Sequence, residues 1–193
     1  MQTVHGRAQH YAWGDTSAIP DMVGQPVDGR PWAEWWMGTH PLAPSTLDDG
    51  ASLQSVSGEL PYLLKLMAAA QPLSLQTHPD HLRAAAGFER EEMLGIARDS
   101  PARTYRDVFA KPEMLCPMTT FDTLCGFRPV DDTVSLLHEI DAHDLAVFLQ
   151  HEKLTTTVTA MYRNEFDVTS TIAACRKHDR VEAELVTELA QAY

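Results

Sequence analysis

The sequence has few cysteines, few basic residues and no long apolar run, and each shortage argues against a class of protein. Its three cysteines are widely spaced and form no CxxC pair, which indicates reduced thiols rather than a disulfide framework. Lysines and arginines number 15 against 27 aspartates and glutamates, and the net charge of −12 argues against a nucleic-acid binder. The most apolar stretch, residues 60–70, is too short to span a bilayer, and residues 1–13 hold no signal-peptide core. We therefore expect a soluble cytoplasmic protein with neither a nucleic-acid nor a membrane partner.

Proline and glycine are absent after Pro129, and this absence divides the chain into two parts. Residues 1–130 hold all four tryptophans and short apolar runs that end at turn residues, a pattern typical of a β sandwich or barrel. The most strand-like segments are residues 60–67 and 72–78. We predict an α+β chain, mainly β, with a β domain over residues 1–130 and a helical domain over residues 131–193.

Beyond residue 130, apolar residues recur at helical spacing and predict three or four helices. A run of three polar residues, 131–133, is expected to cap the first of them. The apolar stripes are Val134, Leu137 and Ile140; then Leu145, Phe148 and Leu149; then Val181, Leu185, Val186 and Leu189.

Two ligand-binding patterns are present only in defective form. Gly24 and Gly29 have the spacing of a phosphate-binding loop, but Arg-Pro follows where Lys-Ser or Lys-Thr is required. His138-Glu139 with His143 is one residue longer than the helical zinc-protease motif. Five positions along one helix would turn His143 away from His138, so we expect no shared ion there.

Residues 72–80 carry the spacing of metal ligands. On a strand, alternate side chains share a face, so Ser74, Gln76 and His78 are expected to point one way and Leu73 and Leu75 toward the core. The Gln76 amide oxygen and the His78 imidazole can then ligate one divalent metal ion. Alone, this pattern is more often a surface strand than a metal site.

Three further residues strengthen the hypothesis of a metal site. Lys111 and Glu113 flank Pro112 and would share a face of a strand edge or bulge. Lys65 interrupts an apolar strand, where a lysine must reach solvent or meet an anion. Together with residues 76 and 78, these groups offer a neutral oxygen, a nitrogen, a carboxylate and two cations, which suits a metal site that binds an anionic substrate.

Six stretches of the sequence, in order, cover roughly residues 4–130 and resemble one enzyme family. They are residues 11–14, 33–41, 60–65, 72–80, 111–114 and 124–129. The family is the type I phosphomannose isomerases, zinc-dependent enzymes with a cupin core. The resemblance implies interconversion of mannose 6-phosphate and fructose 6-phosphate, in which a proton moves between C1 and C2 through an ene-diol.

The resemblance also implies a fold, a cofactor and a site. The fold is a cupin-type jelly roll, incomplete in this chain, and the cofactor is one zinc ion per chain. The implied zinc ligands are Gln76, His78 and Glu113; the implied catalytic residues are Lys65 and Lys111; and substrate binding would involve Trp13, Ser74, Lys65 and Lys111. A later histidine completes the zinc site in the longer family members, and no histidine of the helical half matches its motif.

The chain is expected to be the front part of an isomerase or a shortened homologue, and its open β edges favour self-association.

Two other functions stay open. A non-catalytic module that binds zinc and sugar phosphate is the first alternative. An iron-dependent cupin oxygenase is the second, and it is disfavoured because such sites use more histidines than the single His78.

Overall fold

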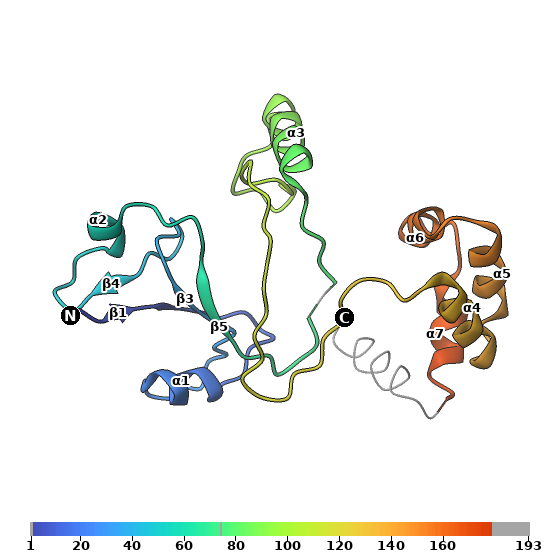
Figure 1. The fold of residues 1–193 in the computed structure, drawn as a ribbon, viewed down its shortest axis with the longest axis horizontal. Coiled ribbons are helices and arrows are strands. Elements are labelled where there is room, and N and C mark those ends of the chain that lie inside the picture. The colour runs from blue at the N-terminus through green and yellow to red at the C-terminus, as the bar shows by residue number, and fades with distance from the viewer. Residues whose placement is uncertain (1, 74, 179–193) are drawn as a thin grey trace. The chain divides into compact units, whose positions relative to one another are not determined.

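The computed structural model describes residues 2–73 and 75–178, whose helices and strands are labelled in Figure 1. The chain divides into two compact units. One unit comprises Met1–Leu73 with Arg128–Tyr193, and the other comprises Ser74–Phe127. The fold is α+β, as predicted. It is not mainly β among the described residues, because helices cover far more of them than strands and three helices occur before residue 130. No helix within the described part of the chain is long and apolar enough to cross a membrane.

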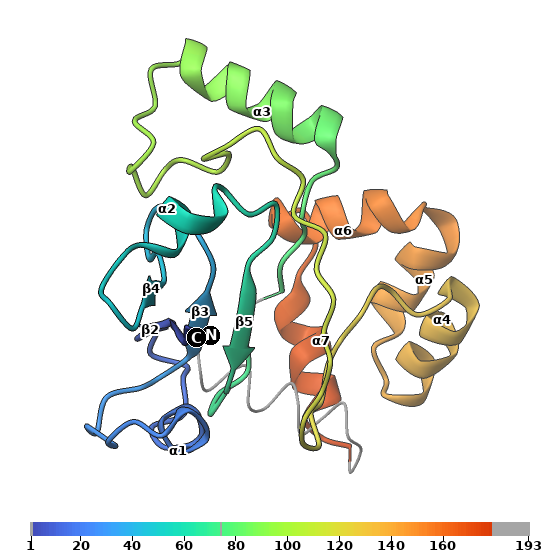
Figure 2. The same cartoon turned by 60° about the vertical axis from the view of Figure 1, so that its left-hand side comes forward.

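Among the described residues of the first unit, five short strands form two antiparallel sheets. The three-stranded sheet has the order β2-β3-β5, and Figure 2 shows β5 beside β3. At its centre, Trp36 of β3 lies opposite Arg7 on one side and Lys65 on the other. The second sheet pairs β1 with β4. The strands are β1 (Val4–His5), β2 (Arg7–Gln9), β3 (Glu34–Met37), β4 (Thr46–Leu47) and β5 (Leu64–Met67).

The two predicted strands fare differently in the structure. Only the second half of residues 60–67 forms a strand, β5. The prediction of a strand over residues 72–78 is wrong, since its described residues form neither strand nor helix, and Leu75 is 64% exposed instead of facing a core. Residues 111–113 also lie outside strands. Alternating side chains define a face, but a strand also needs a hydrogen-bonded neighbour, and these segments pair with no described strand.

Two short helices connect strands of the first unit. Helix α1 (Ala18–Val23) lies between β2 and β3 in the chain, and α2 (Leu53–Ser57) lies between β4 and β5. The carboxylate of Asp15 precedes α1, and its Oδ1 atom accepts hydrogen bonds from the backbone N–H groups of Ser17 and Ala18, both at 2.7 Å. These backbone donors, Ala18 first, lower the pKa of Asp15 below its ordinary value of 3.8. The ionised carboxylate therefore stabilises the start of a helix whose Ile19 is only 2% exposed.

Replacing Asp15 with alanine is expected to lower the free energy of unfolding by about 1 kcal/mol at pH 7. The folded-state pKa is depressed, so the contribution is present above the unfolded value of 3.8 and is lost as the pH falls through the folded value. Urea unfolding followed by tryptophan fluorescence at pH 7 and pH 3 measures this. Asp15→Asn, which keeps the acceptor oxygen without the charge, should lose less. An equal difference between wild type and Asp15→Ala at both pH values would contradict the assignment.

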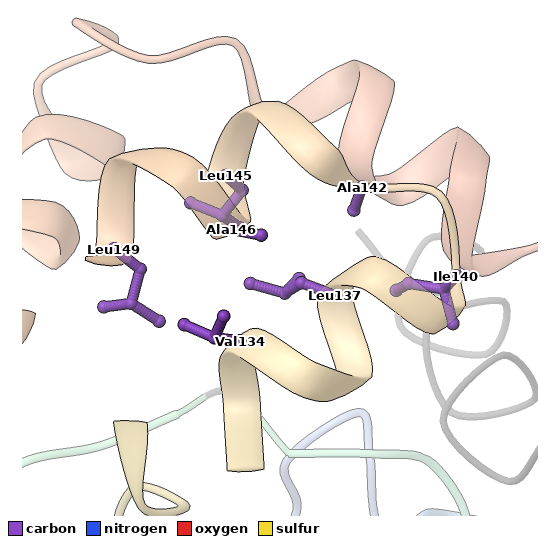
Figure 3. Packing of buried hydrophobic residues seen from close by; sticks show 7 residues of the cluster. All are labelled: Val134, Leu137, Ile140, Ala142, Leu145, Ala146 and Leu149. Carbon is purple, nitrogen blue, oxygen red and sulfur yellow. The ribbon is translucent and has the colours of Figure 1, made fainter. Parts of the chain in front are cut away.

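Within residues 130–178, which the structure describes, four helices occur, where the sequence predicted three or four for the whole region after residue 130. They are α4 (Val130–Glu139), α5 (His143–His151), α6 (Leu154–Tyr162) and α7 (Val168–Cys175). Figure 3 shows that the apolar side chains of α4 and α5 face one another, among them Val134, Leu137 and Leu149. The first two predicted stripes thus contribute to a buried core. The third stripe, over residues 181–189, lies outside the described residues.

The start of α4 differs from the prediction. The N-cap position is Pro129, which offers no side-chain cap, and Asp131 and Asp132 lie in the first turn of the helix. Carboxylates in the first turn still interact favourably with the partial positive charge of the helix N-terminus. The acidic run therefore marks the helix start, but by charge rather than by capping.

The junction between α4 and α5 corrects the expectation for the two histidines. Helix α4 ends at Glu139 and α5 begins at His143, with Asp141 between them at a φ of 60°. The two residues thus lie on separate helices, and Nδ1 of His138 is 3.1 Å from Nδ1 of His143. The expectation that His143 turns away was wrong because it assumed one continuous helix. The zinc-protease motif, which needs such a helix, is absent.

The second unit contains α3 (His81–Met93), a helix that the sequence analysis did not predict. Its N-cap is Asp80, whose carboxylate accepts from the Arg83 backbone N–H at 2.8 Å. The signal was an aspartate before a run rich in alanine and in paired charges, which favours a helix. It was obscured because the surrounding sequence is rich in proline and glycine.

A buried arginine ties α3 to the loop that follows it. The Arg103 side chain is 0% exposed, and its guanidinium donates to the carbonyl oxygens of Ile96 at 2.6 Å and Tyr105 at 2.7 Å. It also lies 3.1 Å from a carboxylate oxygen of Glu91 and 2.8 Å from one of Glu92. The chain after α3 is thus folded around one cation.

Candidate functional site

The imidazole of His78 and the carboxylate of Glu113 meet in the second unit. Nε2 of His78 lies 3.3 Å from Oε2 of Glu113, although the residues are far apart in the sequence. Bonds of about 2.0–2.1 Å around a tetrahedral zinc ion place two ligand atoms about 3.4 Å apart. The side chains are 33% and 56% exposed, so the pair is open to solvent. The two predicted ligands therefore have the separation that a shared metal ion requires.

The third predicted ligand, Gln76, lies two residues before His78 and is exposed. Among the described residues, no group of three or more histidine, cysteine, aspartate and glutamate side chains is arranged to hold a metal ion. Gln76 carries an amide, which is not one of these side-chain types. Ser74, the remaining site residue predicted within residues 72–80, lies outside the described residues.

Lys111 lies two residues before Glu113 and is half exposed. Its Nζ atom is 2.9 Å and 3.1 Å from the two carboxylate oxygens of Asp107. An exposed pair at this i,i+4 spacing contributes little to stability. It does, however, hold the charge of the lysine near the backbone that carries Glu113. Asp107 was not among the predicted site residues, and its signal in the sequence is a carboxylate four residues before Lys111.

Lys65 lies on β5 in the first unit and meets an anion, one of the two outcomes expected for a lysine in an apolar strand. Its Nζ atom is 3.2 Å from Oε1 of Glu34, whose side chain is 8% exposed. The other oxygen, Oε2, accepts a hydrogen bond of 2.7 Å from the indole N–H of Trp36. The sequence analysis missed Glu34, because nothing in the residue pattern shows that this carboxylate is buried beside Lys65.

Trp13 is half-buried and stacks on Tyr11, with ring centroids 5.8 Å apart and an interplanar angle of 26°. Burial, and then the Glu34 carboxylate, raise the pKa of the Tyr11 hydroxyl above its ordinary value of 10.0, while Lys65 opposes this. Tyr11, Glu34 and Lys65 therefore act on one another electrostatically. The described site residues that were predicted form two groups: Trp13 and Lys65 in one unit, and Gln76, His78, Lys111 and Glu113 in the other.

The chain matches one family of known enzymes. The model of the type I phosphomannose isomerase catalytic domain matches residues 1–57 and 51–130. The chain belongs to this family. The resemblance inferred from the six ordered stretches is confirmed, and the match covers the residues that carry Gln76, His78 and Glu113.

Named relatives agree with the family. The chain is 36% identical over 173 residues to mannose-6-phosphate isomerase of Escherichia coli, an alignment that covers 78% of this chain and 44% of that enzyme. It is 30% identical over 199 residues to the human mannose-6-phosphate isomerase, covering 88% of this chain and 44% of the relative. The chain thus spans less than half the length of these phosphomannose isomerases.

Solved phosphomannose isomerase structures resemble the chain over its whole length. A variant of the Salmonella typhimurium enzyme superposes with a TM-score of 0.84 at 27% identity, covering 100% of this chain and 56% of that one. The mannose 6-phosphate isomerase of the same organism, bound to its substrate fructose 6-phosphate and to zinc, superposes with a TM-score of 0.70 at 28% identity. That comparison covers 100% of this chain and 52% of the neighbour.

Proposed function

We propose that the chain carries zinc-binding and substrate-binding residues of a mannose-6-phosphate isomerase, which interconverts mannose 6-phosphate and fructose 6-phosphate. The proposed organisation is a cupin-type catalytic part over residues 1–130 and a helical domain over residues 131–193. The observation that carries the proposal is the 3.3 Å separation of His78 Nε2 and Glu113 Oε2, within the two stretches that resemble the family's zinc motifs. The zinc-bound and substrate-bound relative supports it.

The proposed zinc ligands are Gln76, His78 and Glu113, one ion per chain. A bound zinc ion supplies Lewis-acid polarisation of the substrate carbonyl and stabilises developing negative charge. One carboxylate with two neutral ligands leaves the site net positive, which favours an anionic substrate. The reaction to be catalysed moves a proton between C1 and C2 through an ene-diol.

The remaining residues are proposed to bind and orient the sugar phosphate. Lys65 and Lys111 supply positive charge for the phosphate or the developing oxyanion, or transfer a proton. The hydroxyl of Ser74 donates a hydrogen bond to a substrate oxygen, and the ring of Trp13 forms an apolar wall. A sugar phosphate is thus the proposed ligand.

Two proposals about the surroundings of the chain accompany this function. A second copy of the chain is a proposed partner, because β2 and β5 are the edges of the three-stranded sheet. The cytoplasm is the proposed location, because Cys116 and Cys125 are free thiols.

The alternative is a module that binds zinc and sugar phosphate without turnover. The alignment with the Escherichia coli enzyme covers 44% of that enzyme, so an experiment has to separate zinc binding from turnover. An iron-dependent oxygenase finds no support in the family match or in the zinc-bound relative.

The deciding experiment is an isomerase assay of the 193-residue chain with added zinc. We expect conversion of mannose 6-phosphate to fructose 6-phosphate, its loss on adding a chelator, and its recovery with excess zinc. Bound zinc without turnover, and without exchange of the C2 proton with solvent, would favour the binding module. A chain that neither binds zinc nor isomerises the sugar would overturn both readings.

A further inference from the structure

Glu34 is a buried carboxylate whose two oxygens each contact a different group. Its side chain is 8% exposed, with Oε1 3.2 Å from the Lys65 ammonium and Oε2 2.7 Å from the Trp36 indole nitrogen. A buried charge is costly unless it is paired and hydrogen-bonded. These two contacts meet that requirement, and they fix the carboxylate in one orientation.

The sheet register explains why these three side chains meet. Glu34 and Trp36 are two apart on β3, so they share a face, and Trp36 lies directly opposite Lys65 on β5. Glu34 is therefore the diagonal neighbour of Lys65, within reach of a long side chain. Because β3 is the central strand of the sheet, the backbone that carries Glu34 is hydrogen-bonded on both sides.

We propose that Glu34 is a positioning residue that holds Lys65 in place and keeps it as an ammonium cation. A carboxylate at this distance stabilises the charged form of a lysine. Lys65 is thus a fixed cation, suited to the phosphate or another anionic part of the substrate. What Lys65 binds rests on the proposed function; its pairing with Glu34 does not.

The first test compares the acetylation of Lys65 in the wild-type chain and in a chain that lacks the Glu34 carboxylate. Only the neutral amine reacts with acetic anhydride, so trace acetylation between pH 6 and pH 11, read by peptide mass spectrometry, reports its protonation. Glu34→Gln is expected to move the midpoint of the Lys65 profile to lower pH and to raise its rate at pH 8 about tenfold. The exposed Lys153 serves as an internal reference, and Glu89→Gln, at an exposed position on α3, as the matched variant; neither profile should move.

The pH dependence of the Lys65 acetylation rate distinguishes the loss of the Glu34 charge from a loosening of the structure. Loosening of the sheet would raise the acetylation rate at every pH without moving the midpoint. An unmoved midpoint in a folded Glu34→Gln chain, verified by near-ultraviolet circular dichroism, would overturn the proposal. No substrate is needed, so a shifted midpoint without isomerase activity would refute the proposed function alone.

A second variant decides the matter if Glu34→Gln does not fold. Lys65→Met leaves the carboxylate in place and removes the cation that lowers the Tyr11 pKa. The Tyr11 ring signal, assigned with a Tyr11→Phe chain labelled with ¹³C-tyrosine, is expected to titrate at higher pH in Lys65→Met than in wild type. An unchanged titration would mean that these groups are not coupled in solution, and it would overturn the proposal.

Discussion

Replacing His78 with alanine is expected to remove zinc from the chain, if the proposed function is right. The substitution deletes the only nitrogen ligand of the proposed set and leaves Glu113 and Gln76, which cannot hold the ion at two such exposed positions. Loss of a residue that merely supports a ligand already weakens metal binding by about 10–100-fold. We expect the loss of a ligand itself to exceed about a hundredfold. The measurement is zinc content after dialysis against a weak chelator, together with competition titration of the affinity.

The matched control for this loss is His81→Ala, three residues further on and also exposed. It removes an imidazole from the same region without touching the His78–Glu113 pair, so it should keep its zinc. Equal zinc content in His78→Ala and wild type would show that the metal site has been assigned to the wrong residues. Glu113→Gln should weaken zinc binding as well, because an amide is a poorer ligand than a carboxylate for this ion.

Replacing Arg103 with methionine is expected to destabilise the second unit by about 3–5 kcal/mol. Methionine fills much of the volume but leaves the Glu91 carboxylate, 7% exposed, without its buried partner. It also removes the donors to the carbonyl oxygens of Ile96 and Tyr105. Hydrogen exchange of the α3 amides and urea unfolding both measure the effect, which should be confined to residues of this unit.

Two further variants make this prediction specific. Arg106→Met removes an exposed arginine from the same loop and should change the free energy of unfolding by less than about 0.5 kcal/mol. The double change Arg103→Met with Glu91→Met removes both buried charges and should recover part of the loss. An Arg103→Met chain with unchanged α3 exchange would mean that the arginine does not hold the unit together.

The sequence could predict the features that depend on local pattern. The apolar spacing of Val134, Leu137 and Leu145 was sufficient to predict α4 and α5, because burial of such a stripe is what makes a short helix stable. The motif residues His78 and Glu113 were also identified, and the structure brings their side chains together. Their roles as zinc ligands stay a prediction.

The features that the sequence could not predict depend on partners distant in the chain. Residues 72–78 have the alternation of a strand, but a strand forms only where a neighbour supplies hydrogen bonds. The separate stripes predicted two helices, but the position of the break between them at Asp141 was hidden because an aspartate, with no proline or glycine beside it, adopts the left-handed conformation there. The anion that Lys65 required was foreseen, but its identity as Glu34 depends on the register of β3 and β5.

The pairing of His78 with Glu113 has a consequence for the chain segment that joins these two residues. Both residues lie outside helices and strands, and the chain that joins them contains the whole of α3. An ion bound to both would act as a removable cross-link that closes this long loop. Closing a loop lowers the conformational entropy of the unfolded chain, and the effect grows slowly with loop length. Metal loading would therefore set how cooperatively the second unit unfolds, independently of any chemistry on a sugar.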